Sequence, residues 1–99
     1  MNRGYRVVYG SVNAKRETDK FLKRLPRDMQ QHLYNAMKGL GTNPRPQQAR
    51  QLSIEVDVFG HAARYRLRVG EYRVLYDVDD QAKTVVILAV RRRSEKTYH

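Results

Sequence analysis

The chain has 99 residues and no cysteine, and its 20 Lys and Arg against 10 Asp and Glu give a formal net charge of +10. A chain of this length supports one modest core, so we expect a single domain over residues 1–99, while the missing cysteines exclude disulfides and thiolate-bound metal centres. The positive charge attracts polyanions, which leaves nucleic acid, an acidic membrane surface and an acidic protein as partner classes.

The N-terminal half predicts a short strand followed by two helices. YRVVY, residues 5–9, is rich in β-formers and predicts the strand. Apolar residues then recur at helical spacing over residues 11–25, which predicts an amphipathic helix that ends at Pro26. The same spacing returns after Pro26 and stops at Gly39, so a second, antiparallel helix is expected.

The sequence shows no pattern typical of a signal peptide or a membrane span. The first ten residues lack the apolar run of a signal peptide, and no segment approaches the roughly 20 apolar residues of a membrane span. We therefore expect a cytoplasmic protein without a membrane partner.

The C-terminal half predicts a loop and then strands. Residues 42–50 contain two prolines and predict the loop, and alternation at residues 54–58 predicts a short strand before the turn at Phe59-Gly60-His61. Three further strands are predicted at residues 64–69, 72–78 and 83–90. Gly70-Glu71 joins the first two as a two-residue hairpin turn.

The simplest assembly of these strands is an antiparallel meander. The strand at residues 83–90 is apolar almost throughout, which predicts an interior position in the sheet. The expected fold class is α+β, with an N-terminal strand and two antiparallel amphipathic helices packed on a small antiparallel sheet.

The turn at Gly70-Glu71 fixes which residues of its two strands lie opposite each other. Arg68 then opposes Arg73, and alternation sorts the side chains between the two faces of the sheet. One face is apolar and is expected to pack under the helices; it carries Tyr65, Leu67, Val69, Tyr72, Val74 and Tyr76. The other face is cationic and carries Arg64, Arg66, Arg68 and Arg73, with Asp77.

The cationic face is interpreted as a binding site for phosphates. Arg68 opposite Arg73 is a like-charge pair that costs stability, so stability alone would not select it. A planar guanidinium grips phosphate through two hydrogen bonds and stacks on a base. The competing interpretation is an ordinary exposed sheet face, on which arginine stems pack well.

The last nine residues continue the basic pattern. They begin with Arg91, Arg92 and Arg93 and contain Lys96 and Tyr98. Basic groups beside an aromatic ring are typical of proteins that bind single-stranded RNA. A solvated tail is the alternative.

Histidine and glutamate candidates for acid–base chemistry are few. His32, His61 and His99 have no metal-ligand spacing, so no metal is expected. His61 or His99 could act as a general acid or base, or could be an exposed bystander. Glu95 could act as a base, although its basic neighbours fit a surface ion pair equally well.

The order of the elements and the motifs of residues 65–90 resemble a known family. An arginine-containing strand, a turn, YRVLY, an acidic turn and TVVILAV, with RRR and a near-terminal tyrosine after them, resemble the RelE toxins of the RelE/ParE superfamily. The resemblance covers nearly the whole chain. It implies the toxin of a type II toxin–antitoxin system, an endoribonuclease that cuts mRNA in the ribosomal A site and inhibits translation without a metal or cofactor.

The resemblance also implies partners. These are a RelB-like antitoxin, the ribosome with its rRNA, and mRNA, while DNA would be contacted only through the antitoxin complex. Two other functions remain open. ParE-like members of the superfamily inhibit DNA gyrase without cutting RNA, and a non-catalytic RNA-binding domain would need only the charge.

Site residues follow from the resemblance position by position. Arg66 and Arg68 match the family's paired basic positions, Arg73 matches the arginine of its YR(L/V)xY motif, and Tyr98 matches its C-terminal tyrosine. Arg91 and Arg93 both remain candidates for the last site arginine. Further contacts to RNA are expected from Arg64, Arg92 and Lys96.

Two departures from the family pattern bear on the chemistry. The family's paired positions are often lysine, whereas Arg66 and Arg68 essentially cannot exchange a proton, so their expected role is electrostatic. Residues 53–63 are also longer than the short turn usual at that point, which could alter contacts with the ribosome or antitoxin.

Overall fold

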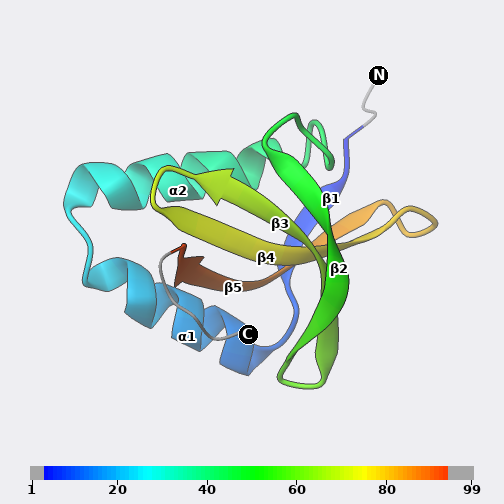
Figure 1. Cartoon of the computed structure of the whole chain (residues 1–99), viewed down its shortest axis with the longest axis horizontal. Helices are drawn as coiled ribbons and strands as arrows, with labels where there is room; N and C mark the ends of the chain where they lie inside the picture. Colours follow the sequence, from blue (N-terminus) through cyan, green and yellow to red (C-terminus); the bar gives the residue numbers. More distant parts are fainter. Residues whose placement is uncertain (1–3, 94–99) are drawn as a thin grey trace.

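The fold consists of two helices packed on one face of a five-stranded sheet (Figure 1). The computed structural model describes residues 4–93. In chain order its elements are β1 (Arg6–Tyr9), α1 (Val12–Lys23), α2 (Arg27–Gly39), β2 (Ala49–Val58), β3 (His61–Val69), β4 (Tyr72–Asp79) and β5 (Thr84–Arg92). The predicted α+β class, the N-terminal strand and both helices are confirmed. Within the described residues, no helix is both long enough and apolar enough to cross a membrane.

The strand order is β1-β5-β4-β3-β2. Strands β2 to β5 form the predicted antiparallel meander, and β1, whose pairing was not predicted, joins β5 in parallel. The parallel pairing follows from the connection, since both helices lie between β1 and the meander. The pairing also gives β5 a neighbour on each side, as its apolar run predicted.

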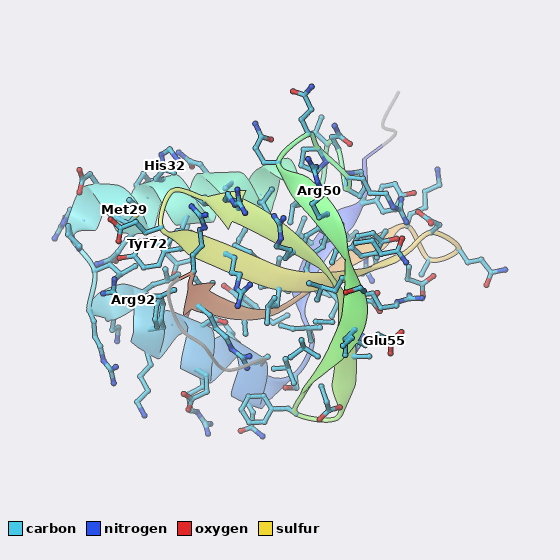
Figure 2. The ribbon with its side chains drawn as sticks, in the orientation of Figure 1. Met29, His32, Arg50, Glu55, Tyr72 and Arg92 are labelled. Atoms are coloured by element: carbon cyan, nitrogen blue, oxygen red, sulfur yellow. The ribbon has the colours of Figure 1, made fainter. Side chains whose placement is uncertain are left out.

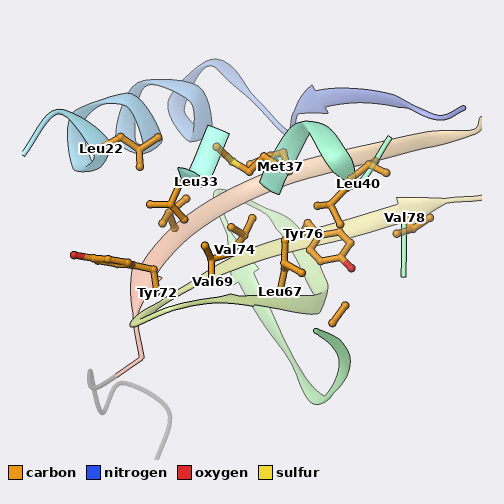
Figure 3. Packing of buried hydrophobic residues seen from close by; sticks show 14 of the residues in the cluster. Leu22, Leu33, Met37, Leu40, Leu67, Val69, Tyr72, Val74, Tyr76 and Val78 are labelled. Atoms are coloured by element: carbon orange, nitrogen blue, oxygen red, sulfur yellow. The ribbon is translucent and has the colours of Figure 1, made fainter. Parts of the chain in front are cut away.

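The helices bury their apolar stripes against the sheet. The Ser11 hydroxyl accepts a hydrogen bond from the Ala14 amide (3.0 Å), which caps the start of α1. Side chains such as Leu22 and Leu33, both fully buried, then meet Val74 and Tyr76 of the sheet (Figure 3). The prediction that Tyr65, Tyr72 and Tyr76 belong to the apolar face is confirmed, because all three pack in this core cluster.

The hairpin of β3 and β4 has the predicted register. Arg68 lies opposite Arg73, and Val69 lies opposite Tyr72 at the turn. Gly70 adopts a left-handed backbone conformation (φ 56°) that glycine tolerates better than other residues. The sorting of side chains between the two faces therefore follows the prediction.

Strand β2 departs most from expectation. It starts at Ala49, so the end of the predicted loop at residues 42–50 and the start of the predicted strand at residue 54 were both wrong. Its pairing with β3 shifts between Gln51, opposite Tyr65, and Val56, opposite Ala63. Four residues of β2 thus face one residue of β3. We call residues 52–55 the β2 bulge.

The far half of β2 covers part of the sheet face that lacks helices. Val58 packs there with Ala63, Leu75 and Leu88 in a second, smaller apolar cluster. A register shift in β5 opposite Leu75 and Tyr76 helps to build this cluster. The rest of that face, toward the Gly70 turn, is left for the arginines.

Asp80 connects three distant segments. It accepts hydrogen bonds from the Tyr5 hydroxyl (2.7 Å) and from both terminal nitrogens of Arg45 (3.3 and 2.9 Å). These bonds hold the loop before β2 and the start of β1 against the turn between β4 and β5. The bonds from Arg45 and Tyr5 also lower the pKa of the Asp80 carboxyl.

We expect Asp80→Asn to lower the urea midpoint of unfolding at neutral pH. Because the folded pKa lies below the unfolded one, the carboxylate stabilises the fold above the usual carboxyl range and loses its effect as pH falls through the lowered pKa. The difference in urea midpoint between wild type and variant should therefore narrow as the pH falls below about 4, the usual range of a carboxyl pKa. Glu17→Gln, the same charge change at an exposed position of α1, controls for net charge. If the urea midpoints of wild type and Asp80→Asn fell in parallel with pH, the stabilising role of the Asp80 carboxylate would be contradicted.

Candidate functional site

Five arginines lie on the face of the sheet that the helices leave open. Arg68, Arg73 and Arg91 are direct neighbours across β3, β4 and β5, and Arg50 and Arg66 are direct neighbours across β2 and β3. Side chains on directly opposite residues of antiparallel strands share one face. The two rows are one pleat apart, or about 6.6 Å along β3. We call Arg50, Arg66, Arg68, Arg73 and Arg91 the arginine face.

The geometry of the sheet forces these cations together. Neighbouring strands lie about 4.8 Å apart, so the guanidinium stems of each row run side by side. Burial lowers the pKa of the Arg66 guanidinium, and the nearby charges of Arg68 and Arg50 lower it further. The part of this lowering that comes from neighbouring arginines reflects crowded positive charge, which a bound anion would relieve.

Three arginines of this face have no carboxylate partner among residues 4–93. The ion pairs found within residues 4–93 involve neither Arg66, Arg68 nor Arg91. Arg50 donates to the carbonyls of Gln47 and Ala49, both at 2.9 Å. Arg66, Arg68 and Arg91 thus lie on one surface, Arg68 exposed and the other two half-buried, without an ion pair inside residues 4–93.

Asp77, the acidic residue predicted on this face, is engaged with Arg64. The Arg64 Nε donates to Asp77 Oδ1 at 2.7 Å, and His61 Nε2 lies 3.3 Å from Oδ2. Burial raises the pKa of the Asp77 carboxyl, but these hydrogen bonds outweigh burial and leave it lowered. Arg64 therefore differs from Arg66 and Arg68, because its charge is neutralised by a carboxylate of the protein.

The three consecutive arginines after Val90 take different positions. Arg91 lies opposite Arg73 and completes the row. Arg93 donates its amide to the Glu71 carbonyl (2.7 Å), and its charge still lowers the pKa of Arg66. Both candidates for the last site arginine are thus near the arginine face, with Arg91 in the row and Arg93 at its border.

Arg92 lies on the other face of the sheet. Its guanidinium carbon is 5.3 Å from the centre of the Tyr72 ring, and Figure 2 shows the two side chains together at the end of the sheet. This position separates Arg92 from the arginine face. Tyr98 and Lys96 lie outside the described residues.

His61 and His32 do not join the arginine face. His61 comes five positions before Arg66 on β3, which places them about 16 Å apart along the strand. His32 is on α2, in the helix layer, and His99 lies outside the described residues. Within residues 4–93, no three His, Asp or Glu side chains gather as a metal ion would require.

Arg50 is the one arginine of the face that the sequence pattern did not predict. It follows two prolines and was placed in a loop, yet it starts β2 and lies directly opposite Arg66. No alternation marks this position in the sequence, because Ala49 is out of phase with the apolar residues Leu52, Ile54 and Val56 that follow.

Comparisons with known proteins agree with this architecture. A family model described as the ParE toxin of the type II toxin-antitoxin system, parDE, matches residues 8–97. Among solved structures, the toxin–antitoxin complex RelBE2 from Mycobacterium tuberculosis contains a chain similar to this one, with 31% identity and a TM-score of 0.67, covering 91% of this chain and 99% of that chain. A search of curated proteins found no match.

Two further structures are similar. The archaeal RelE–RelB complex from Pyrococcus horikoshii has a chain with 26% identity and a TM-score of 0.67, covering 93% of this chain and 98% of that one. A mutant of the Escherichia coli toxin RelE in the free state has 16% identity and a TM-score of 0.55, covering 92% and 85% respectively. At that identity the last likeness concerns the fold alone.

Removing one of the mutually repelling arginines should stabilise the protein. We expect Arg68→Gln to raise the free energy of unfolding by about a few tenths of a kcal/mol, because it removes the like charge opposite Arg73. The gain should disappear in about 1 M salt, where exposed charges are screened. Urea unfolding at low and high salt measures both effects.

Arg64→Gln is the matched control on the same strand. It breaks the ion pair with Asp77 and should lower the free energy of unfolding. If Arg68→Gln destabilised the protein as much as Arg64→Gln does, the arginine face would not be a site of mutual repulsion.

Proposed function

We propose that this chain, which belongs to the ParE toxin family of type II toxin–antitoxin systems within the RelE/ParE superfamily, is a ribosome-dependent endoribonuclease. It would cut mRNA in the ribosomal A site and thereby inhibit translation. The observation that carries the proposal is the arginine face, on which strand pairing gathers five arginines in two adjacent rows. Arg66, Arg68 and Arg73 of this array occupy the positions that match the RelE pattern.

The row of Arg68, Arg73 and Arg91 is suited to hold the scissile phosphate. In metal-free cleavage the 2′-oxygen attacks phosphorus, the 5′-oxygen leaves, and negative charge develops on the oxygens of the phosphate. Guanidinium groups fixed in advance beside those oxygens stabilise this charge without reorganising during the reaction. Arg50 and Arg66, one pleat away, would hold a neighbouring phosphate.

Proton transfer has to come from another source. The 2′-hydroxyl must lose a proton and the leaving 5′-oxygen must gain one, and arginine does neither at neutral pH. His61 is too far along β3 to reach the same phosphate. Tyr98 or a group of the ribosome would fill this role, and the ribosome would supply orientation by fixing the mRNA in the A site.

The partner that silences the toxin is proposed to be a RelB-like antitoxin. Two of the similar structures are complexes of a toxin with its antitoxin. Acidic residues of such a partner could cover the arginine face and neutralise its charge. The toxin would act in the cytoplasm, where mRNA is translated, and would reach DNA only as part of the antitoxin complex.

Inhibition of DNA gyrase is the second candidate function. The match of residues 8–97 to the ParE toxin model favours it, since ParE-like toxins act on gyrase and leave RNA intact. Gyrase inhibition would leave the arginine rows without an obvious role in chemistry, although they could still contact an acidic protein surface.

Expression of the chain under tight control separates these functions. We expect codon-phased cuts in translated mRNAs within minutes of induction, measured by mapping 5′ ends. Arg73→Ala and Arg91→Ala should each reduce cutting by about 100-fold or more, because each removes a cation beside the developing charge. Tyr98→Phe should reduce it as well if the hydroxyl transfers a proton.

Arg92→Gln is the control for this experiment, because Arg92 adjoins Arg91 in sequence but lies on the opposite face. It should cut like the wild type. Growth arrest with intact mRNA and altered DNA supercoiling would contradict the ribonuclease function and support inhibition of gyrase. If the folded protein were fully expressed without growth arrest, the result would support a non-catalytic RNA-binding domain.

Salt dependence should identify the arginines that contact phosphate. For binding to a single-stranded RNA, the slope of log Kobs against log salt concentration should become shallower by about 0.7 for each phosphate that a variant no longer neutralises. We expect this change in Arg66→Gln and Arg68→Gln. Arg64→Gln, whose arginine is already neutralised by Asp77, should leave the slope unchanged, and an equal change in all three variants would show that only net charge matters.

A further inference from the structure

The β2 bulge forms one wall of a pocket beside the arginine face. Between the pairs Gln51–Tyr65 and Val56–Ala63, the four residues 52–55 of β2 lie opposite the single residue Arg64 of β3. This segment therefore arches away from the regular ladder. The pocket beneath it has a volume of about 250 Å³ and is lined by Leu52, Ser53, Ile54, Val56, Arg73, Leu75 and Arg91. A regular β2 with one residue opposite each residue of β3 would not provide this wall.

The lining combines aliphatic side chains with two cations. Leu75 is almost completely buried (3% exposed) and forms the floor, whereas Ile54 is 79% exposed at the crest of the bulge. Arg73 and Arg91, which lie opposite each other on β4 and β5, line the same pocket. Among the described residues that line the pocket, none carries a carboxylate.

We propose that this pocket binds a nucleobase of the RNA whose phosphates lie on the arginine face. The inference rests on the proposed function for the presence of RNA on that face and adds a subsite that reads the base. Arg73 and Arg91 belong to both the phosphate-binding row and the pocket lining. A nucleotide with its phosphate on that row could therefore place its base in the pocket next to the same two arginines.

The chemistry of the pocket suits a base better than an apolar side chain. A base offers a flat apolar surface to Leu75 and Ile54 and a π-face on which a guanidinium can stack. Its polar edge could pair with the Ser53 hydroxyl or with the backbone of the bulge. An aliphatic group from a protein partner would cover the Arg91 guanidinium without giving it a hydrogen-bond acceptor, which is unfavourable.

The consequence for the toxin is base preference at or next to the cut. The arginine rows contact phosphates, which are identical in every sequence, whereas the pocket would contact the part of the nucleotide that differs. The longer segment at residues 53–63 would then serve in substrate selection.

A comparison of nucleotides with ribose 5-phosphate tests the pocket without requiring cleavage. Methyl signals of the full chain would be followed by NMR during titration with the four nucleoside 5′-monophosphates and with ribose 5-phosphate. We expect at least one nucleotide to bind about fivefold tighter than ribose 5-phosphate. Only nucleotides should shift the methyls of Leu52, Ile54 and Val56.

Ile54→Ala is the test variant, since its side chain is exposed and its loss should not unfold the protein. It should reduce the ratio of nucleotide to ribose 5-phosphate affinity to near one. Val12→Ala, which removes a similarly exposed aliphatic group on α1, should leave the ratio unchanged. Equal affinity for nucleotides and ribose 5-phosphate, an unchanged ratio in Ile54→Ala, or methyl shifts caused only by an antitoxin peptide would overturn the proposal.

The outcomes separate this inference from the proposed function. If mRNA stays intact in cells while nucleotides shift the bulge methyls, the ribonuclease assignment fails and the base pocket stands. If mRNA is cut in codon phase but nucleotides bind no better than ribose 5-phosphate, only the pocket fails.

Discussion

The antiparallel backbone ladder that holds like charges side by side is the constraint on which the rest of this structure depends. Pairing of β3, β4 and β5 places Arg68, Arg73 and Arg91 in one row, and no change of side-chain conformation can separate their stems. The repulsion persists because the register is fixed by the apolar face beneath, where Val74 and Tyr76 are completely buried against the helices. A slip of one residue would bring the arginines into the core. The core therefore maintains the site.

Arginines of similar sequence context have different electrostatic roles in this fold. Arg64 and Arg66 are two residues apart on β3 and face the same side, yet Arg64 is paired with Asp77 whereas the pKa of Arg66 is lowered by burial and by other arginines. Arg91 and Arg92 are adjacent, yet Arg92 packs over the Tyr72 ring on the opposite face. The net charge thus counts arginines, such as Arg64 and Arg92, that are outside the arginine face, and it does not indicate where that face lies.

The sequence predicted the helices, the hairpin of β3 and β4 and most of the arginine face, because those segments have regular periods and a two-residue turn. It did not predict β2, because the bulge interrupts the alternation and places Arg50 and the pocket where no regular pattern marks them. The choice between Arg91 and Arg93 stayed open because the apolar run of β5 has no alternation and its register shifts opposite Leu75 and Tyr76. Pairings between segments distant in sequence determined where β2 begins and placed Arg91, but not Arg93, directly opposite Arg73.

The proposed ribonuclease would hold the RNA backbone at the cut on its arginine face. The most direct measurement is a structure of the toxin on a translating ribosome whose A-site mRNA carries a 2′-O-methyl group that blocks cleavage. We predict that the scissile phosphate lies within hydrogen-bonding distance, about 2.7–3.2 Å, of guanidinium nitrogens from Arg68, Arg73 and Arg91. An mRNA contacting the helix layer, or a toxin that does not occupy the A site, would contradict this claim.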